Sequence, residues 1–237
     1  MIEFDNVSFA YETGAPVLKN VSFRIAEGES VGLIGANGAG KSTVMKLLLG
    51  LLQGEGRVLV DGTEVTRATL AETRRKPGFV LQNSDHQMFM PTVLEDMTFG
   101  PLNYGATRAE AEARADAALE QLGIAPLKYR RNHQLSGGEK RMAAIATILA
   151  MEPRSILMDE PTAALDPYNR RLVLRVIQSL TQTKLIASHD LDLILDVCPR
   201  VILLSGGSVA ADGAADVILR DRALLEAHRL ELPLRLQ

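Results

Sequence analysis

The sequence predicts an α/β protein, in which a parallel-sheet core carries an antiparallel β segment near its start and an inserted helical segment. Three observations support this class. Segments 7–11 and 21–25 alternate apolar and polar residues, which is typical of half-buried strands. Four later runs are short and apolar along their whole length, as buried parallel strands are: 30–34, 78–81, 156–158 and 184–187. A capped helical pattern separates the second of these runs from the third.

The composition allows one large domain, or one domain with a subdomain, since 46% of the 237 residues are hydrophobic. The net charge of −3 argues against a general nucleic-acid binder. The single cysteine, Cys198, excludes an internal disulfide and fits a reducing compartment. No segment reaches the ~18 uninterrupted apolar residues of a membrane-crossing helix, and the first residues are unlike a signal peptide. We therefore expect a soluble, cytoplasmic protein that meets any membrane through a partner.

The first elements along the chain are the two alternating strands, which flank a turn region that holds Gly14 and Pro16. The apolar strand 30–34 comes next, and a helical pattern follows at 42–51. The glycine-rich loop between them has the sequence GANGAGKS, residues 35–42, which is the phosphate-loop pattern.

This loop suits a phosphate group for direct physical reasons. Glycines let the backbone wrap so that several N–H groups point at one anion, and the following helix adds its positive N-terminal end. Lys41 is expected to reach the outer phosphates, and the Ser42 hydroxyl to ligate Mg²⁺. The alternative is a glycine-rich turn without a ligand, which the order strand, loop, helix disfavours. The loop alone leaves kinases, GTPases and ATPases open, but an Asn-Lys-x-Asp motif for guanine is absent from the sequence.

Two carboxylates follow the apolar run at 156–158. Asp159 is placed to hold Mg²⁺ through water, and Glu160 to orient and deprotonate an attacking water. Two such charges at the end of a buried strand would repel each other unless a cation offset them. The alternative is an acidic turn, which the phosphate loop in the same chain disfavours.

The helical insert is expected at 84–151. Thr107 and Glu110 form a capping box, apolar residues recur behind it at helical spacing, and Gly123 suits the position that ends a helix. A second helix is expected at 137–149. The whole chain, 1–237, then forms one domain: an α/β core at 1–83 and 152–211, the insert at 84–151, and a helical tail at 212–237.

The start of the second helix is a further anion-ready site. Ser136 and Glu139 form a capping box around Gly137 and Gly138, which leaves bare backbone N–H groups at a helix end. One chain thus carries two sites suited to phosphate. The alternative is an ordinary capped helix.

With these segments, 35–42, 135–139 and 159–160, the chain resembles the ATP-binding-cassette (ABC) ATPases over nearly its whole length. The resemblance implies a P-loop NTPase (RecA-like) core with an N-terminal antiparallel β subdomain and an inserted α-helical subdomain. It implies ATP hydrolysis with ATP and Mg²⁺ bound. Glu139 stands where the family signature commonly has glutamine.

The resemblance also implies roles for single residues. Tyr11 looks like the residue that stacks on adenine, and Gln82 like the glutamine that senses Mg²⁺ and water. Asp166, in the segment 164–166, resembles the dimer-contact loop, and His189 the histidine that senses the γ-phosphate. The implied catalytic residues are Gln82, Glu160 and His189; the implied Mg²⁺ ligands are Ser42, Gln82 and Asp159; the implied nucleotide contacts are Tyr11, Asn37, Gly38, Gly40, Lys41, Ser42, Thr43, Ser136, Gly137, Gly138, Glu139 and Asp166.

In that family two subunits pack head to tail, and the signature helix of one contacts the γ-phosphate held by the other. This arrangement explains why one chain needs two anion sites, and it is self-complementary, as expected of a two-fold dimer. The partner is either an identical or a related ATPase chain.

Segment 82–103 resembles the energy-coupling-factor importers of the cobalt and nickel group, with Ser84 and His86 where those proteins commonly have Pro and Asp. This implies uptake of cobalt or nickel ions through a transmembrane coupling protein and a substrate-binding membrane protein. The chain would lie at the cytoplasmic face of the membrane, without nucleic acid. Met88, Phe89 and Met90 then belong to a docking groove, or alternatively to the core. The four histidines show no metal-ligand spacing, so we expect the transported ion not to touch this chain.

Other functions stay open at this point. The same machinery could import a vitamin such as biotin. A soluble cassette ATPase acting on nucleic acid usually carries two cassettes or a long insertion, and neither is present. A small-molecule kinase would use the phosphate loop but give no role to 135–139.

Overall fold

The computed structural model describes residues 1–12 and 14–237, which its internal contacts divide into two compact units. The first unit consists of Met1–Pro77, Ser155–Glu160 and Thr181–Gln237. The second consists of Gly78–Arg154 and Pro161–Leu180. Each unit therefore collects segments that are far apart in the sequence.

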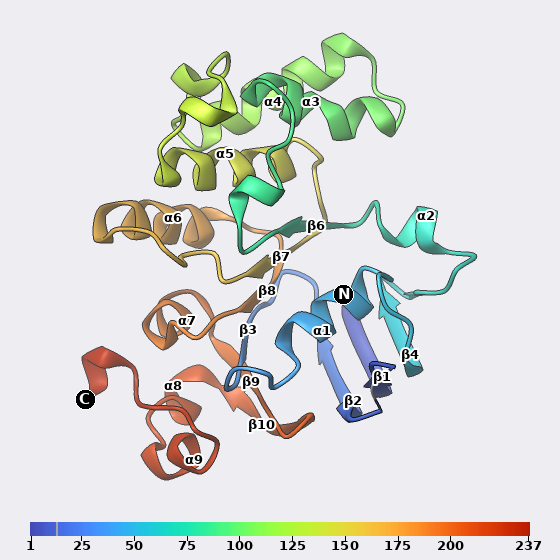
Figure 1. The fold of residues 1–237 in the computed structure, drawn as a ribbon, viewed down its shortest axis with the longest axis vertical. Helices are drawn as coiled ribbons and strands as arrows, with labels where there is room; N and C mark the ends of the chain where they lie inside the picture. Colours follow the sequence, from blue (N-terminus) through green and yellow to red (C-terminus); the bar gives the residue numbers. More distant parts are fainter. Residues whose placement is uncertain (13) are drawn as a thin grey trace. The chain divides into compact units, whose positions relative to one another are not determined.

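The first unit opens with an antiparallel sheet in the order β2-β1-β4-β5, drawn in blue and cyan in Figure 1. Alternate residues of its strands point into the core, where the rings of Phe4 and Phe23 stack with their centroids 4.6 Å apart. The antiparallel opening was predicted, although both strands extend beyond the alternating segments. The strands are β1 (Ile2–Ala10), β2 (Pro16–Ile25), β4 (Glu55–Val60) and β5 (Thr63–Glu64).

A second sheet of the first unit contains strands in the order β10-β9-β3-β8-β7. Strands β9, β3, β8 and β7 run parallel, and β10 pairs antiparallel with β9. Three of the four apolar runs form strands β3, β7 and β8, as predicted, and their side chains are almost entirely buried. The strands are β3 (Ser30–Ile34), β7 (Ser155–Asp159), β8 (Thr183–Ala187), β9 (Arg200–Ser205) and β10 (Ser208–Ala214).

Helix α1 (Lys41–Leu48) contacts both sheets, through β4 and β7. It buries six of its residues, among them Val44 and Met45, so the loop before it is fixed by packing on two sides. The helix ends before the predicted residue 51, because Gly50 turns the chain with φ +62°.

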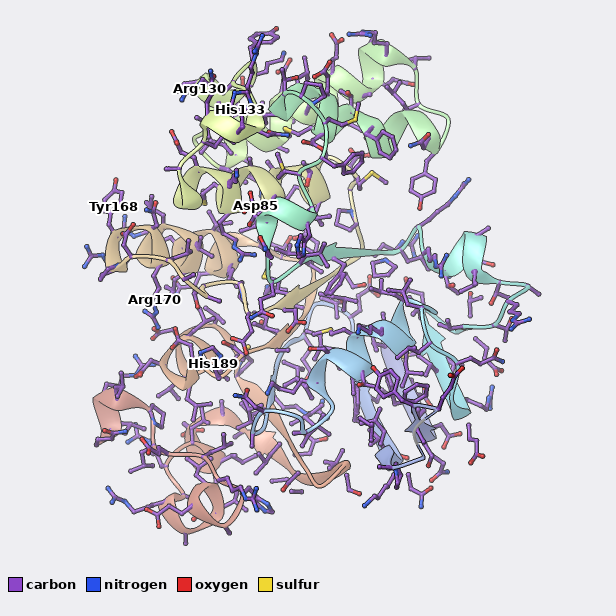
Figure 2. All side chains as sticks on the ribbon, viewed as in Figure 1. Asp85, Arg130, His133, Tyr168, Arg170 and His189 are labelled. Atoms are coloured by element: carbon purple, nitrogen blue, oxygen red, sulfur yellow. The ribbon has the colours of Figure 1, made fainter. Side chains whose placement is uncertain are left out.

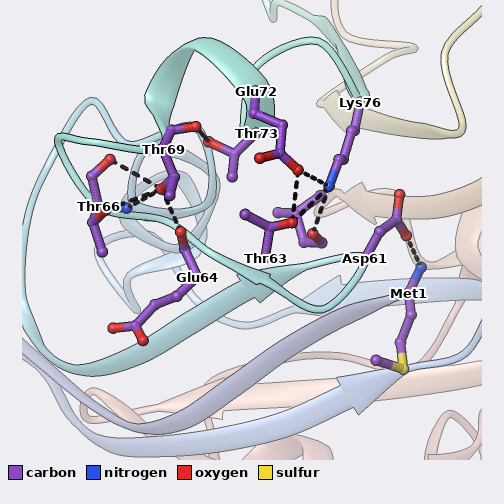
Figure 3. A network of polar contacts seen from close by, with 10 residues as sticks. Met1, Asp61, Thr63, Glu64, Thr66, Thr69, Glu72, Thr73 and Lys76 are labelled. Atoms are coloured by element: carbon purple, nitrogen blue, oxygen red, sulfur yellow. Dashed lines mark hydrogen bonds and ion pairs between the residues drawn. The ribbon is translucent and has the colours of Figure 1, made fainter.

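A network of polar contacts fixes the chain between β5 and the end of the unit's first segment (Figure 3). Here α2 (Leu70–Thr73) presents Glu72, whose carboxylate lies 2.9 Å from the Lys76 ammonium. Lys76 also donates to the Thr63 hydroxyl at 2.9 Å. The N-terminal ammonium is 2.5 Å from Asp61, so the start of β1 is held to the turn between β4 and β5.

The C-terminal part of the first unit contains short helices, where a helical tail from 212 was expected. Strand β10 occupies the first residues of that tail and α8 (Ala215–Ile218) starts after it, followed by α9 (Arg222–Ala227) and η4 (Leu234–Leu236). Arg235 of η4 binds α7 (Leu191–Val197), with Nη1 2.6 Å from the Asp196 carboxylate.

The second unit is mainly helical, and β6 (Pro77–Val80) leads into it. Its helices α3, α4 and α5 pack on one another, and α6 packs on α5. The predicted capping boxes are present at Thr107 and Ser136, and a third, which the sequence analysis did not identify, starts α3 at Thr92. The helices are η1 (Ser84–His86), α3 (Val93–Asn103), α4 (Arg108–Gln121), η2 (Ala125–Leu127), η3 (Asn132–Gln134), α5 (Gly137–Leu149) and α6 (Pro167–Ser179).

A buried carboxylate holds the chain before α3 in place. Asp96 accepts hydrogen bonds from the backbone N–H groups of Phe89 and Met90, both at 3.1 Å, and from the Asn132 amide. Burial raises the pKa of Asp96, and these three hydrogen bonds act in the opposite direction. The carboxylate therefore connects the loop at Phe89 and Met90, and the short helix η3, to α3 of the second unit.

Within residues 1–12 and 14–237, no helix combines the length and the apolar character that crossing a membrane requires.

Candidate nucleotide site

The residues predicted to act on nucleotide fall into two groups, one in each unit. The first unit holds Tyr11, the loop 35–43, Asp159, Glu160 and His189. The second unit holds Gln82, the segment 136–139 and Asp166. Each group has its own geometry.

The phosphate loop joins the carboxyl end of β3 to α1, as predicted. Gly40 has φ +105°, and a Cβ atom there would lie 2.6 Å from Cδ2 of Leu18. Only glycine allows both this backbone conformation and the close contact. The loop thus lies tightly against β2, while Asn37 and Gly38 at its tip are exposed. Thr43, further into the helix, is buried.

The Lys41 ammonium lies inside the curve of this loop. Its Nζ donates to the backbone oxygens of Gly35 at 2.6 Å and Ala36 at 3.3 Å. Burial lowers the pKa of Lys41, while the negative charges of Glu160 and Asp159 raise it. A cation held by carbonyl groups can exchange those carbonyls for phosphate oxygens, which bind it more strongly.

Ser42 and Asp159 meet at the start of α1. The Ser42 hydroxyl donates to Oδ2 of Asp159 at 3.0 Å. Burial raises the pKa of Asp159 and the charge of Glu160 adds to this, whereas Ser42, Lys41 and Lys46 lower it. A hydroxyl and a carboxylate side by side are the oxygen ligands that Mg²⁺ prefers, and a divalent cation would offset the two carboxylate charges. The donor set therefore fits Mg²⁺.

Glu160 is buried, with 8% of its surface exposed, and its backbone has the left-handed φ of +49°. Its N–H donates to the Ala187 oxygen at 2.8 Å. Its carboxylate accepts from the Ser188 hydroxyl at 2.9 Å and from the His189 backbone N–H at 3.0 Å. The side-chain Nδ1 of His189 lies 2.8 Å from the same carboxylate. The predicted base and the predicted γ-phosphate sensor are thus in contact.

His189 lies two residues before the start of α7 (Figure 2), and its side chain is 66% exposed. Because Nδ1 faces Glu160, Nε2 is the ring nitrogen left for a ligand. Tyr11, just after β1, is 41% exposed, and its ring meets Phe9 edge-on with centroids 4.9 Å apart. Tyr11 therefore presents an exposed ring on which a planar group can stack.

In the second unit, the N-terminus of α5 has the predicted capping geometry. The Ser136 hydroxyl accepts from the Glu139 N–H at 3.3 Å, and the Glu139 carboxylate accepts from the Ser136 N–H at 2.8 Å. The hydrogen bonds from Ser136 lower the pKa of Glu139. A Cβ atom on Gly138 would overlap the amide of Asn169, so glycine is needed here for α6 to approach α5.

Asp166 is the N-cap of α6. Its carboxylate accepts from the backbone N–H groups of Tyr168 at 2.8 Å and Asn169 at 3.0 Å, and these bonds with the Asn169 side chain lower the pKa of Asp166. Asp166 therefore supports its own helix, and the exposed Tyr168 follows it (Figure 2).

Gln82 follows β6 and lines a cavity of about 490 Å³ together with Gly137, Lys140 and the segment 163–165. The structure thus brings Gln82 and the start of α5 to one cavity of the second unit. Arg141 of α5, 3% exposed, also lines this cavity, and it donates to the backbone oxygens of Leu81, at 2.6 Å, and Gln82.

Two residues of these groups were missed by the sequence analysis. Ser188 contacts Glu160, and its signal was its place directly before His189 at the end of a buried strand. Arg141 is a charged residue on a helix face that is otherwise apolar. Lys140 reinforces the same connection through an ion pair with Asp85 of η1, which is labelled in Figure 2.

Comparison with known proteins identifies relatives that span almost the whole chain. Residues 18–163 match the family model described as ABC transporter. A relative from Geobacter sulfurreducens, named as an ABC transporter ATP-binding protein without a substrate, is 47% identical over 100% of this chain and 96% of its own length. The cobalt import ATP-binding protein CbiO of Rhodobacter capsulatus is 43% identical over 96% of this chain and 84% of its own length. The energy-coupling factor transporter ATP-binding protein EcfA of Methanothermobacter thermautotrophicus is 41% identical over 98% of this chain and 77% of its own length.

Solved structures are similar over the same extent. CbiO1 of Clostridium perfringens, described as part of the ABC transporter complex CbiONQ, superposes with a TM-score of 0.85 at 32% identity, covering 98% of this chain and 95% of its own. The ATP-binding cassette MJ0796, in a dimeric post-hydrolysis state with ADP and phosphate, gives a TM-score of 0.80 at 30% identity, covering 91% of this chain and 99% of its own.

Proposed function

Because the chain belongs to the ABC transporter family, we propose that it is the ATPase subunit of an energy-coupling-factor importer that takes up cobalt or nickel ions. At the coarser level its fold is the ABC ATPase fold, and it is an ATP-binding subunit that hydrolyses ATP. ABC ATPases work as dimers with transmembrane partners and associate with the membrane through them. The finer assignment is supported by the relatives named for cobalt import and for energy coupling.

The first-unit residues would bind the triphosphate. The N–H groups of the loop 35–43 and the Lys41 ammonium take the β- and γ-phosphates, and the exposed ring of Tyr11 stacks on adenine. Ser42 and Asp159 would hold Mg²⁺, and the resemblance implies Gln82 as a further ligand. When bound, Mg²⁺ neutralises charge on the phosphates.

Hydrolysis would then rest on Glu160 and His189. Glu160 orients a water molecule and takes one of its protons, while the water oxygen forms a bond to the γ-phosphorus. The bond from the γ-phosphorus to its bridging oxygen breaks, and its electron pair leaves with ADP. Nε2 of His189 contacts the γ-phosphate, because Nδ1 faces Glu160.

The second-unit residues would act on the nucleotide of the other subunit. The capped N-terminus of α5 offers the N–H groups of Gly137 and Gly138 to the γ-phosphate held by the partner's phosphate loop. Asp166 and the segment 164–166 would lie at the same dimer interface. ATP then holds the two chains together, and its hydrolysis replaces that attraction by repulsion between separated phosphates.

The base assignment is tested by Glu160→Gln, which keeps the size of the side chain but removes its ability to accept a proton as a carboxylate. We expect ATP binding to persist while turnover falls by at least about 100-fold, the usual contribution of a general base. The variant should form an ATP-dependent dimer, measured by light scattering. Normal turnover by this variant would exclude Glu160 as the base.

Exposed aromatic residues in the segment 82–103 and just after it carry the proposal of an importer. Phe89 is 63% exposed and Phe99 44%, with their rings in edge-to-face contact at 5.0 Å. Leu102 and Tyr104 are also exposed, at 41% and 43%. Such a cluster on a water-facing surface is typical of a protein interface, and we assign it to the transmembrane coupling protein. A substrate-binding membrane protein completes the complex, at the cytoplasmic face of the membrane.

Uptake by cells that express the complete complex tests the substrate. We expect accumulation of labelled cobalt or nickel ions that requires Lys41, with no accumulation of biotin. The double variant Phe89→Ser/Phe99→Ser should keep ATP binding but lose co-purification with the membrane proteins, since it removes the apolar surface alone. Biotin uptake in place of metal uptake would assign the chain to vitamin import. If the double variant still co-purified with the membrane proteins, the assignment of Phe89 and Phe99 to a docking surface would be wrong.

A further inference from the structure

We propose that Ser188 is the positioning residue of Glu160, and that it leaves Oε1 as the carboxylate oxygen that receives the proton of water. This inference rests on the proposed role of Glu160 as the base. It concerns how one orientation of that carboxylate is maintained during the reaction.

The backbone of Glu160 needs support from its surroundings. Its φ of +49° is uncommon for a residue with a side chain and costs free energy unless neighbouring groups maintain it. One support is the hydrogen bond from Glu160 N–H to the Ala187 oxygen at 2.8 Å, which continues the β7–β8 pairing past Asp159. The residue after Ala187 is Ser188, so this pairing also places Ser188 beside the carboxylate.

The direction of the Ser188 hydroxyl follows from its partners. The backbone N–H of Asp190 donates to Ser188 Oγ at 3.0 Å, so the oxygen acts as acceptor on that side. The one hydrogen of the hydroxyl is then directed at Oε2 of Glu160, 2.9 Å away. Ser188 is fully buried, at 0% exposure, and cannot turn to water instead.

The two oxygens of Glu160 are used unequally. Oε2 lies within 2.9 Å of Ser188 Oγ, 2.8 Å of His189 Nδ1 and 3.3 Å of His189 N. Oε1 accepts from His189 N at 3.0 Å, and a carboxylate oxygen has about two acceptor positions. Oε1 is therefore the oxygen with capacity for a water molecule.

Ser188 and His189 differ in how permanent their contacts are. The His189 side chain is 66% exposed, so water competes for its Nδ1 contact with Oε2 even while Nε2 faces a γ-phosphate. Ser188 is enclosed and its hydroxyl keeps its two partners while water competes for the His189 contact. The hydroxyl is thus the side-chain contact that keeps the carboxylate oriented at the moment of reaction.

Ser188→Ala removes this contact and should lower kcat by roughly 10- to 100-fold, the range for a hydrogen bond to a charged group, with KM for ATP changed by less than about twofold. Ser188→Thr keeps a hydroxyl and should retain kcat within about threefold of the parent value. Ser188→Cys has a weaker donor, so its kcat should lie between that of the parent chain and that of Ser188→Ala. ATP affinity by calorimetry and the thermal midpoint of each variant separate an effect on orientation from an effect on folding.

Failure of this inference can be told apart from failure of the base assignment. If Glu160→Gln is inactive but Ser188→Ala turns over like the parent chain, Ser188 has no positioning role. A threonine variant as slow as the alanine variant would also overturn the proposal. If the alanine variant does not fold, the cysteine variant takes its place, and a kcat equal to that of the parent chain would overturn the proposal. Normal turnover by Glu160→Gln would instead remove the base assignment on which the proposal rests.

Discussion

The acidic residue Glu139 stands at a helix end that is expected to meet a phosphate. Its carboxylate is held by the Ser136 N–H at 2.8 Å, and its pKa is lowered by the hydrogen bonds from Ser136. A negative charge at a helix N-terminus stabilises the helix but repels an approaching anion. The charge of Glu139 thus favours the stability of α5 but opposes the binding of phosphate. A substitution that removes only the charge should therefore lower the first and improve the second.

Glu139→Gln is expected to strengthen ATP-dependent dimer formation several-fold, because glutamine still accepts from the Ser136 N–H but carries no charge. The free energy of unfolding should fall by about 0.3–1 kcal/mol through the lost interaction with the helix dipole. Light scattering against ATP concentration measures the first effect, and urea titration the second.

Glu110→Gln is the matched control, since Thr107 and Glu110 form the same capping box on α4. It should show the small loss of stability without a change in dimer formation. If both variants strengthened the dimer equally, the charge of Glu139 would not face the partner's phosphate.

At the level of single residues, the sequence was sufficient where a local pattern carries the chemistry. The phosphate loop, the two carboxylates and both capping boxes depend on neighbours within a few positions, so their spacing can be recognised. For Ser188 the place before His189 was a signal of position alone, because the serine acquires its role from Glu160, which is distant in the sequence. Arg141 depends in the same way on carbonyl groups of a distant loop.

At the level of elements, the predicted strands and helices were confirmed where the periodicity is uninterrupted. α5 spans the predicted residues, and α4 follows its predicted capping box. β1 is longer than the alternating segment, because Asn6 has φ +50° and the pairing with β2 shifts register between Phe4 and Val7. A bulge of this kind breaks the alternation on which the prediction depended.

One helix of the second unit lies outside the predicted insert in the sequence. The predicted insert was 84–151, whereas the second unit of the structure also includes 161–180. α6 joins it because Gly138 on α5 leaves room for Asn169, a contact between residues whose proximity no local pattern signals.

Asp96→Ala should lower the free energy of unfolding by about 2–4 kcal/mol, because it leaves the N–H groups of Phe89 and Met90 and the Asn132 amide without their buried acceptor. Urea titration followed by circular dichroism measures the change. Asp85→Ala removes an exposed carboxylate from the same unit and should have a much smaller effect. Equal effects of the two substitutions would contradict the assigned importance of the buried acceptor.

At the level of the whole molecule, the chain alternates between its two units along the sequence. The phosphate loop belongs to the first unit, Gln82 and α5 to the second, Asp159 and Glu160 again to the first, Asp166 to the second and His189 to the first. The sequence predicted two anion sites in one chain, but motif spacing does not tell which site completes which.

A complementation experiment decides whether each nucleotide site is shared between two chains. Lys41→Ala disables the phosphate loop and leaves α5 intact. Gly137→Asp places a negative charge at the start of α5, where a Cβ atom meets no neighbour within 4 Å, so the fold should tolerate it. Each variant alone should be inactive. In an equal mixture about half of the dimers pair the two variants, and each of these has one site with an intact loop and an intact helix end.

We therefore expect the mixture to recover roughly a quarter of the parent ATPase rate if the two sites of a dimer act independently. A chain that carries both substitutions is the control, because its dimers with the parent chain have no intact site and its addition should suppress parent activity. If the nucleotide were held within one chain, the results would be reversed: the mixture would stay inactive, and the doubly substituted chain would leave the parent rate unchanged. Release of phosphate from ATP measures the rate in every mixture. Sites shared between two chains give recovery in the mixture of single variants and suppression by the doubly substituted chain, whereas sites within one chain give neither effect.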